Sequence, residues 1–165
     1  VDNYVFGNEQ RGIYLANSWG STIAHKLVAN NALEGIAIVT ERKDPSVLPK
    51  DNEVRANMLA WNGKDALVLP QGLLANSSEG NLFVSTEKPP GFSLGWAGVT
   101  NPTVYGLAAW RALSKQDAHS VERTMPVPGK LVSELKKGQR KLEWSMLTTL
   151  VSGDKAAADR PGPRK

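Results

Sequence analysis

Two adjacent serines and one lysine are the residues of this chain whose types could act together as a catalytic pair. Ser77 and Ser78 lie in the polar run 76–81, which follows the apolar segment 66–74, and Lys115 lies further along the chain. A serine hydroxyl is a weak nucleophile until a base removes its proton, and a neutral lysine amine can be that base. These residue types therefore predict that one of the two serines is a nucleophile and that Lys115 is its general base.

The sequence around Lys115 favours the neutral amine that this chemistry requires. Ser114-Lys115-Gln116-Asp117 has the S-x-x-D pattern of a capping box, which predicts that a helix begins here with Lys115 as its first helical residue. The positive end of the helix dipole and the apolar residues at 107–110 and 112–113 both disfavour a charged ammonium group. A lysine placed against its electrostatic preference is a candidate for a functional role.

Several short segments, taken in order, resemble the polyprotein-processing protease of birnaviruses, a Ser/Lys protease whose catalytic fold is similar to that of the Lon protease domain. The segments that carry the resemblance are Leu33–Glu41, Asn76–Leu82, Trp96–Thr100, Ala112–Lys115, Asp117–His119 and Val127–Gly129. The resemblance implies that Ser78 is the nucleophile, that Lys115 is its base, and that Thr100 accepts a hydrogen bond from the lysine amine and orients it. Glu79 departs from the family pattern, so Ser77 stays open as a second candidate nucleophile.

The same resemblance implies a serine endopeptidase that cleaves a viral polyprotein through an acyl-enzyme. The expected junctions are those that release the capsid precursor and the scaffold protein, with small residues around the scissile bond. The host cell cytoplasm is the expected location, and neither a cofactor nor a metal ion is expected. Self-association through the termini is a further expectation, because self-processing enzymes present their own ends to a neighbouring active site.

The pattern of apolar residues predicts an α+β fold, with a strand-rich N-terminal two-thirds packed with C-terminal helices, and the resemblance implies a Lon-protease-like catalytic core. Period-two patterns and turn signals predict strands at 4–6, 12–15, 35–40, 54–61, 66–69, 82–86, 94–99 and 104–110. Asn62-Gly63 predicts a hairpin between two of these strands, and residues 22–28 are predicted to be a short helical segment.

Helical periodicity appears in the last third of the chain. Helices are predicted at 114–125 and 130–137. Residues 142–151 fit either a strand or a helix, and a helix is preferred because Trp144, Leu147 and Val151 share one face. No internal repeat is apparent in the sequence. Residues 1–152 are predicted to form a single domain, which the resemblance implies is a protease domain, and residues 153–165 a disordered basic tail.

The composition excludes several kinds of site. The 165-residue chain has no cysteine, so disulfides and thiolate metal sites are excluded. Its two histidines, His25 and His119, lie outside any H-E-x-x-H pattern. The net charge is +4, with basic residues concentrated at 130–141 and in the tail. No apolar run approaches the ~18 residues that would indicate a membrane span.

Two other functions stay open. A conventional Ser-His-Asp hydrolase would use His119 as its base, although the chain lacks a G-x-S-x-G motif. A non-catalytic RNA-binding or capsid-binding module would use the basic cluster Lys130–Lys141. The aromatic residues that accompany many nucleic-acid-binding surfaces are not interleaved with this cluster, which argues against a nucleic-acid partner.

Replacing Lys115 by alanine is expected to abolish cleavage of a precursor extended at both ends while the fold is retained, because the nucleophile loses its base. Arginine at this position should also abolish cleavage, since a guanidinium group does not give up its proton near neutral pH. Gel analysis of the precursor measures both effects. Cleavage by Lys115→Ala at the wild-type rate would contradict the Ser/Lys pair.

Overall fold

The computed structural model of this chain consists mainly of short strands, which form three sheets. It describes residues 3–41, 44–96, 99–100, 103–127, 129 and 133. Sheet A contains, in spatial order, β1 (Tyr4–Phe6), β4 (Leu27–Ala29), β7 (Met58–Ala60), β10 (Leu82–Ser85) and β14 (Val121–Thr124). Sheet B contains β2 (Ile13–Ala16), β5 (Ile36–Val39), β8 (Asp65–Pro70), β11 (Gly91–Trp96) and β12 (Val99–Thr100), with β13 (Val104–Tyr105) also paired to β11. Sheet C contains β3 (Thr22–Ala24), β6 (Glu53–Arg55) and β9 (Ser77–Glu79).

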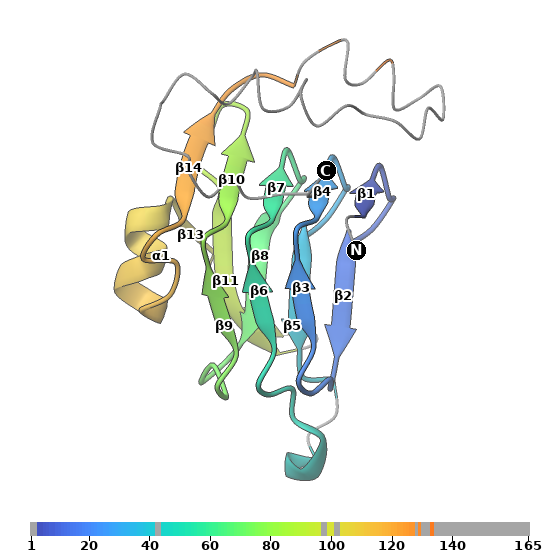
Figure 1. The fold of residues 1–165 in the computed structure, drawn as a ribbon, viewed down its shortest axis with the longest axis vertical. Coiled ribbons are helices and arrows are strands. Elements are labelled where there is room, and N and C mark those ends of the chain that lie inside the picture. Colours follow the sequence, from blue (N-terminus) through green and yellow to red (C-terminus); the bar gives the residue numbers. More distant parts are fainter. Residues whose placement is uncertain are drawn as a thin grey trace.

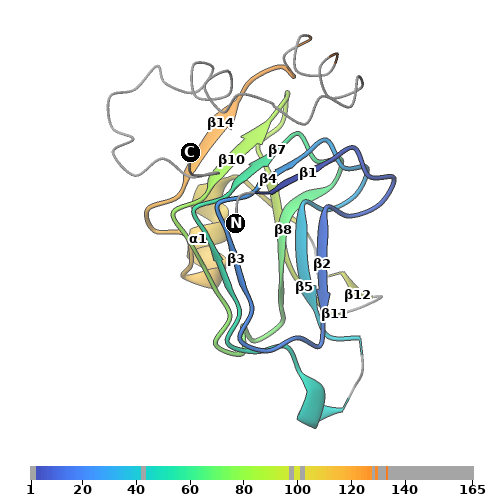
Figure 2. The ribbon, with the colours of Figure 1, turned by 45° about the vertical axis from the view of Figure 1, so that its right-hand side comes forward.

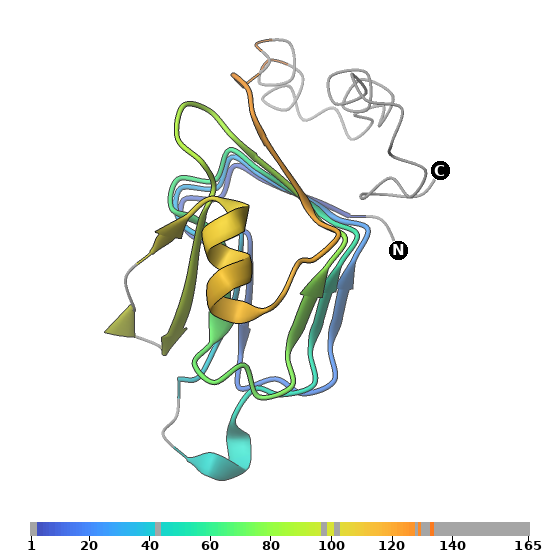
Figure 3. The same ribbon diagram turned by 90° about the vertical axis from the view of Figure 1, so that its left-hand side faces the viewer.

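The chain visits the three sheets in a fixed order, so that it winds as a three-sided β-solenoid. β1, β2 and β3 form the first coil, β4, β5 and β6 the second, and β7, β8 and β9 the third, after which β10 and β11 begin a fourth. Neighbouring coils pair in parallel on every side, and among the described strands only β12 and β13 pair antiparallel, both with β11. Figure 1 shows the strands of successive coils side by side, and in Figure 3 the coils superpose on one another.

The interior of the solenoid is filled by inward-facing side chains from all three sides. Val28, Leu59 and Phe83 come from sheet A, and sheets B and C add branched and aromatic side chains to the same core. The additional core residues include Ile36, Ile38, Leu67, Leu69 and Phe92 from sheet B and Ile23 and Val54 from sheet C. Alternate residues of a strand point to opposite faces of its sheet. The residues between these core positions therefore point to the outer surface.

Each corner of the solenoid is formed by a residue with a left-handed backbone, followed in most coils by asparagine. These pairs are Gly7-Asn8, Asn30-Asn31 and Trp61-Asn62 between sheets A and B, Asp51-Asn52 and Ala75-Asn76 between sheets B and C, and Ala56-Asn57 and Gly80-Asn81 between sheets C and A, with φ from 51° to 68° at the first residue of each pair. The left-handed conformation costs a residue with a side chain roughly 1–2 kcal/mol. The corners therefore depend on compensating interactions.

Stacked asparagine side chains supply that compensation. At the corner between sheets C and A, Asn81 Oδ1 accepts hydrogen bonds from the backbone N–H (2.9 Å) and the side-chain amide (3.1 Å) of Asn57. Asn57 Oδ1 in turn accepts a bond from the backbone N–H of Lys26 at 3.0 Å. Equivalent ladders join Asn8, Asn31 and Asn62 at one further corner, and Asn52 and Asn76 at the other. Each asparagine thus binds the coil before it and satisfies backbone groups at the corner.

The helix α1 (Leu107–Ser114) closes the C-terminal end of the solenoid (Figures 1 and 3). Its Leu107 and Trp110 side chains are buried in the main core, where the Trp110 ring stacks on Phe92 with centroids 5.3 Å apart. Glu122 of β14 accepts a hydrogen bond from the backbone N–H of Leu107 at 2.7 Å. A carboxylate at this end of the helix is favourable, because it faces the positive end of the helix dipole.

The coarse expectation of a strand-rich mixed fold is confirmed, and α1 is the one α-helix whose bounds the described residues give. The strands predicted at 4–6, 35–40, 66–69 and 82–86 correspond to β1, β5, β8 and β10, and 12–15 and 94–99 overlap β2 and β11. The helices predicted at 130–137 and 142–151, the domain boundary at 152 and the tail 153–165 lie outside the described residues, Ser133 apart. No Lon-like core is identified in the described part.

Several local predictions are wrong because the corners were not anticipated. Residues 22–28 contain two strands, β3 and β4, and residues 54–61 contain β6 and β7, with the left-handed residues His25 and Ala56 between the strands. Asn62-Gly63 belongs to a solenoid corner, and β7 and β8 lie in different sheets, so no hairpin forms. An internal repeat is also present, since each coil repeats the same three-strand path.

The order of helix and strand near residue 110 is the reverse of the one predicted. The predicted strand 104–110 contains only the short β13, after which Gly106, with φ 86°, begins α1. The predicted helix 114–125 is contradicted, because α1 ends at Ser114 and residues 121–124 form β14. The apolar residues Leu107 and Trp110 enter the core together only if this segment is helical, and burial therefore overrides the local β-propensity.

Replacing Asn57 by alanine is expected to lower the free energy of unfolding by about 3 kcal/mol, because buried backbone groups in two coils lose their partners. Asn30→Gly is the matched control. Asn30 is exposed with φ 51°, and glycine suits that conformation, so a change below about 0.5 kcal/mol is expected. Urea denaturation followed by circular dichroism measures both. Equal effects of the two substitutions would contradict the structural role of the ladder.

Candidate functional site

The side chain of the predicted nucleophile, Ser78, faces the interior of the solenoid. It lies in β9 in register with Val54 of β6, which is itself paired with Ile23 of β3, and both are core residues. Ser78 is 2% exposed, and its Oγ accepts a hydrogen bond from Asn81 Nδ2 at 3.0 Å. This hydroxyl is therefore part of the corner ladder and is not presented at the surface.

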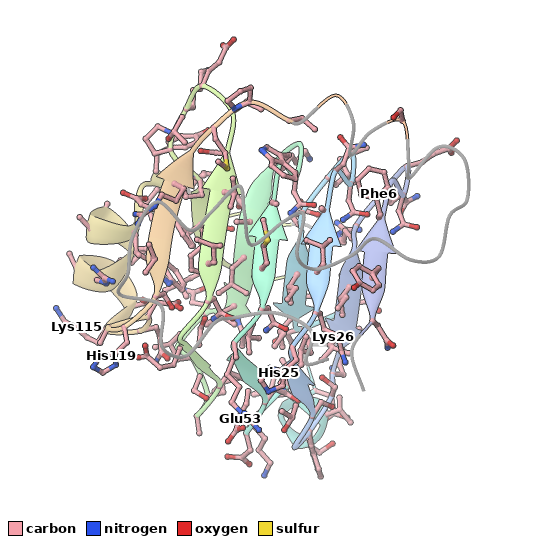
Figure 4. All side chains as sticks on the ribbon, turned by 45° about the horizontal axis from the view of Figure 1, so that its top comes forward. Phe6, His25, Lys26, Glu53, Lys115 and His119 are labelled. Atoms are coloured by element: carbon pink, nitrogen blue, oxygen red, sulfur yellow. The ribbon has the colours of Figure 1, made fainter. Side chains whose placement is uncertain are left out.

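The predicted base, Lys115, lies at the end of a helix and not at its start. It is the C-terminal cap of α1, with φ 61°, and its Nζ donates a hydrogen bond to the carbonyl oxygen of Ala112 at 2.9 Å. The expected capping box is wrong, because Ser114 Oγ instead donates to the Trp110 carbonyl and accepts from the backbone N–H of Gln116. A cation at this end of a helix is electrostatically favoured, and the side chain points away from the sheets in Figure 4.

The structure nevertheless brings the segment after Lys115 to the main chain of Ser78. Gln116 Oε1 accepts a hydrogen bond from the backbone N–H of Ser78 at 2.9 Å, and the Ser78 carbonyl accepts one from the backbone N–H of Asp117 at 2.9 Å. In the described part of the chain, no hydrogen bond joins the Ser78 hydroxyl to the Lys115 amine, and each has a separate partner. Thr100 lies in β12 opposite Gly95, and its side chain is not among those described.

The remaining serine and histidine candidates lie on the outside of the same region. Ser77 precedes Ser78 in β9 and is only partly buried, so it faces outward. His119 is exposed beside α1 (Figure 4), and its Nδ1 lies 3.3 Å from Glu79 Oε1. His25 occupies a left-handed corner position between β3 and β4. His119, the base expected of a Ser-His-Asp hydrolase, is paired here with Glu79.

Glu79, which departs from the pattern of the resembling family, has a structural role. Its carboxylate accepts hydrogen bonds from the backbone N–H groups of Gly80, Ala118 and His119 at 2.6–3.0 Å. The residue therefore fastens the turn after α1 to the third coil. Charge-assisted bonds of this kind are stronger than those between neutral groups.

Asp117 is the buried centre of the C-terminal cap. Its carboxylate accepts hydrogen bonds from Trp110 Nε1 at 2.8 Å, from Asn81 Nδ2 at 3.2 Å and from Ser120 Oγ. Ser120 Oγ in turn accepts a bond from the backbone N–H of Asn81 at 2.8 Å, the position that the next asparagine would occupy in a longer ladder. Burial of a carboxylate is tolerated here because every bond replaces one lost to water.

A second candidate site, here called the aromatic face, consists of Arg11, Tyr14, Trp19, Glu41 and Lys50. Trp19 is 55% exposed, with Lys50 Nζ 4.7 Å above its ring, and Tyr14 is 37% exposed, with the Arg11 guanidinium 4.8 Å from its ring centre. Tyr14 donates a hydrogen bond to Glu41 Oε1 at 2.5 Å. Large aromatic side chains held at the surface by polar partners are typical of binding sites.

The aromatic face lies beside an inserted loop of the second coil. Residues 40–52 connect β5 to β6, whereas the shorter segments 17–21 and 71–76 make the same connection in the neighbouring coils. The loop contains the 3-10 helix η1 (Pro45–Val47) and extends beyond the coils in Figures 1 and 2, where it is coloured teal. Insertions in a repeat protein commonly form its binding face.

Side chains of the first coil hold the inserted loop in place. Asn17 Nδ2 donates to the carbonyl oxygen of Val47 at 2.6 Å, and Asn17 Oδ1 accepts from the backbone N–H of Glu41 at 2.9 Å. Trp19 Nε1 donates to the carbonyl oxygen of Leu48 at 2.6 Å. The polar ends of both exposed aromatic residues are therefore tied to the loop, while the rings remain accessible.

Sequence reasoning missed both the ladders and the aromatic face. The recurrence of asparagine directly after a turn, at 31, 52, 57, 62, 76 and 81, was the available signal for the ladders. No comparable pattern marks Tyr14 or Trp19, because their significance depends on exposure and on a loop that is distant in the sequence.

Comparison with known proteins gives no relative for this chain, since no protein family, no curated protein and no solved structure matches it. Among the described residues, no group of three or more histidines, aspartates and glutamates is placed to hold a metal ion. Within the same residues, no helix has the length and apolar character needed to cross a membrane.

Burial, together with the hydrogen bond to Glu41, raises the pKa of Tyr14 from 10.0 to about 12, although the Arg11 charge acts in the opposite direction. The folded chain therefore favours the neutral phenol. The raised pKa of Tyr14 therefore contributes to the free energy of unfolding in full below pH 10, and this contribution is lost as the pH rises to about 12.

Replacing Glu41 by glutamine is expected to lower the pKa of Tyr14 toward 10.0, because the charge that opposes the phenolate is removed. The difference in tyrosinate absorbance between each protein and its Tyr14→Phe derivative isolates this residue from Tyr4 and Tyr105. Glu53→Gln, an exposed carboxylate on sheet C, is the control and should leave the titration unchanged. An identical titration after Glu41→Gln would contradict the assigned interaction.

Proposed function

We propose that this domain binds an uncharged carbohydrate chain at the aromatic face. The observation that carries the proposal is the pair of exposed aromatic rings, Tyr14 and Trp19, whose polar atoms are both held by the inserted loop. A fixed ring loses little conformational freedom on binding, so its contact area converts efficiently into affinity. The faces of pyranose rings are largely C–H surface and suit such aromatic platforms.

The charge around the rings favours a neutral ligand. Within the loop 40–52 the sequence contains three acidic and three basic residues, and the Arg11 and Glu34 side chains form an ion pair at 2.7 Å. A nucleic acid or an acidic polymer would require an excess of positive charge, which this surface does not provide. Carboxylate, guanidinium and amide groups placed together can instead exchange hydrogen bonds with sugar hydroxyls.

The shape of a solenoid suits a polymer. Stacked coils produce an extended surface with a repeat of ~4.8 Å, and solenoid proteins commonly use such surfaces for binding. Tyr14 lies on the outer face of sheet B in register with Ala37 of β5, which pairs with Val68 of β8. Ala37 and Val68 are only 1% and 7% exposed, so the surface open to a ligand on this side is the Tyr14 ring with the inserted loop beside it. The argument from fold is an analogy, and the aromatic face supplies the specific support.

The Ser/Lys peptidase with a Lon-like core is the rival proposal. Its support is the pair of hydrogen bonds that join Gln116 and Asp117, the two residues after Lys115, to the main chain of Ser78. It requires a rearrangement, because the Ser78 hydroxyl faces the core and the Lys115 amine is bound to Ala112. The basic RNA-binding or capsid-binding alternative depends on residues 130–141, whose placement is not described apart from Ser133.

Trp19→Ala is expected to weaken binding to soluble neutral polysaccharides roughly tenfold, equivalent to about 1.4 kcal/mol, because the stacking platform is lost. Affinity electrophoresis in gels containing β-glucan, xylan or mannan measures the effect, and polygalacturonate serves as the acidic comparison. Tyr14→Ala should also weaken binding to these polysaccharides.

Tyr105→Ala is the matched control for these substitutions, since Tyr105 is an exposed tyrosine on β13, away from the inserted loop. It should leave the affinity unchanged. The proposal fails if none of the neutral polysaccharides retards the protein, or if Tyr105→Ala reduces binding as much as Trp19→Ala. Tighter binding to polygalacturonate than to the neutral polymers would contradict the preference for an uncharged chain.

A further inference from the structure

The outer face of sheet A is apolar and buried, unlike the outer surface of an ordinary solenoid side. Leu27, Met58 and Leu82 pair in register across three coils and are at most 5% exposed. A second row, Ala29, Ala60 and Val84, is equally buried. Both rows belong to an apolar cluster separate from the interior core, because the alternate residues of the same strands fill the interior.

The chain itself begins to cover this face directly after β14. Met125 and Val127 pack against the apolar cluster on sheet A. The indole N–H of Trp61, which follows β7, donates a hydrogen bond to the carbonyl oxygen of Met125 at 3.1 Å. In the sheet, β10 lies between β7 and β14, so this contact joins the chain after the edge strand to the centre of the sheet.

The described residues after β14 are too few to cover the whole face. Five strands at a spacing of ~4.8 Å make sheet A about 19 Å wide. The three residues 125–127 span at most about 10 Å even when fully extended. Leu27 of β4 lies three strands away from β14 and is nevertheless fully buried. Residues 125–127 alone therefore do not account for the burial of Leu27.

We propose that residues 142–151 pack against the outer face of sheet A over β4 and β7. Their sequence places Trp144, Leu147 and Val151 on one face of a predicted helix, which complements the apolar rows of the sheet. Ten helical residues are about 15 Å long, which is enough to cross the ~9 Å of the sheet that residues 125–127 cannot reach. The intervening residues 128–141 can span at most about 50 Å and do not restrict this placement.

The absence of cysteine from the sequence makes a thiol-labelling test direct. Ala60→Cys introduces a single thiol on the outer face of sheet A, and Ala37→Cys introduces a matched thiol on the outer face of sheet B. Both alanines are buried, and the substitution is small. Each is made in the full chain, alone and combined with Leu147→Asp or Thr149→Asp. Thr149 lies on the opposite side of the predicted helix from Leu147.

Leu147→Asp is expected to raise the labelling rate of Ala60→Cys roughly tenfold or more, because local opening of the cover is favoured, and to leave Ala37→Cys unchanged. Thr149→Asp should change neither rate. An unchanged rate at Ala60→Cys after Leu147→Asp would overturn the proposal, and so would an equal rise at both thiols, which indicates unfolding of the solenoid. Protection of Ala60→Cys that depends on protein concentration would assign the cover to a second copy of the chain and overturn the proposal.

Discussion

The structure depends on the satisfaction of backbone hydrogen bonds at the corners of the coils. A chain that turns three times in each coil places N–H groups at the corners, where they are partly withdrawn from water, and each one left without a partner would cost free energy. The asparagine ladders answer this requirement, because one side-chain oxygen accepts bonds from the coil below while the amide donates to a strand carbonyl. The same bonds fix the register of neighbouring coils, since a shift by one residue would separate the stacked amides.

The C-terminal cap continues this arrangement with different residues. Where the next coil would supply another asparagine, Ser120 accepts the bond from the backbone of Asn81, and Asp117 accepts from the Asn81 amide. Asp117 also receives the indole N–H of Trp110, whose ring closes the core by stacking on Phe92. The segment that the sequence suggested as a catalytic helix start is therefore the region where the solenoid is terminated and its core is closed.

The strands could be predicted from the sequence better than their arrangement. Apolar runs such as 36–39 and 82–84 are recognisable because they are buried on both faces. The corners could not be located in the same way. Ala56 and Trp61 adopt left-handed conformations that their residue types do not suggest. Hydrogen bonds between the asparagines that follow them and the neighbouring coil compensate for the cost of these conformations. Ser114-Lys115-Gln116-Asp117 illustrates the opposite error. Its local pattern matches a capping box, but the burial of Trp110 places the helix before it.

The candidate site follows from what each side of the solenoid presents to its surroundings. Sheet A presents buried apolar rows, and sheet C presents charged residues such as Glu53 and Arg55, which pair with each other in solvent and contribute little. Sheet B has the aromatic face at its first coil, with the inserted loop beside it. The ladders restrict the corners of every coil, so a loop inserted between two strands is where the chain can change its surface without breaking a ladder. Asn17 and Trp19 hold that loop in place beside the exposed rings through hydrogen bonds to its carbonyl groups. A binding surface differs in this rigidity from an incidental group of exposed aromatic residues.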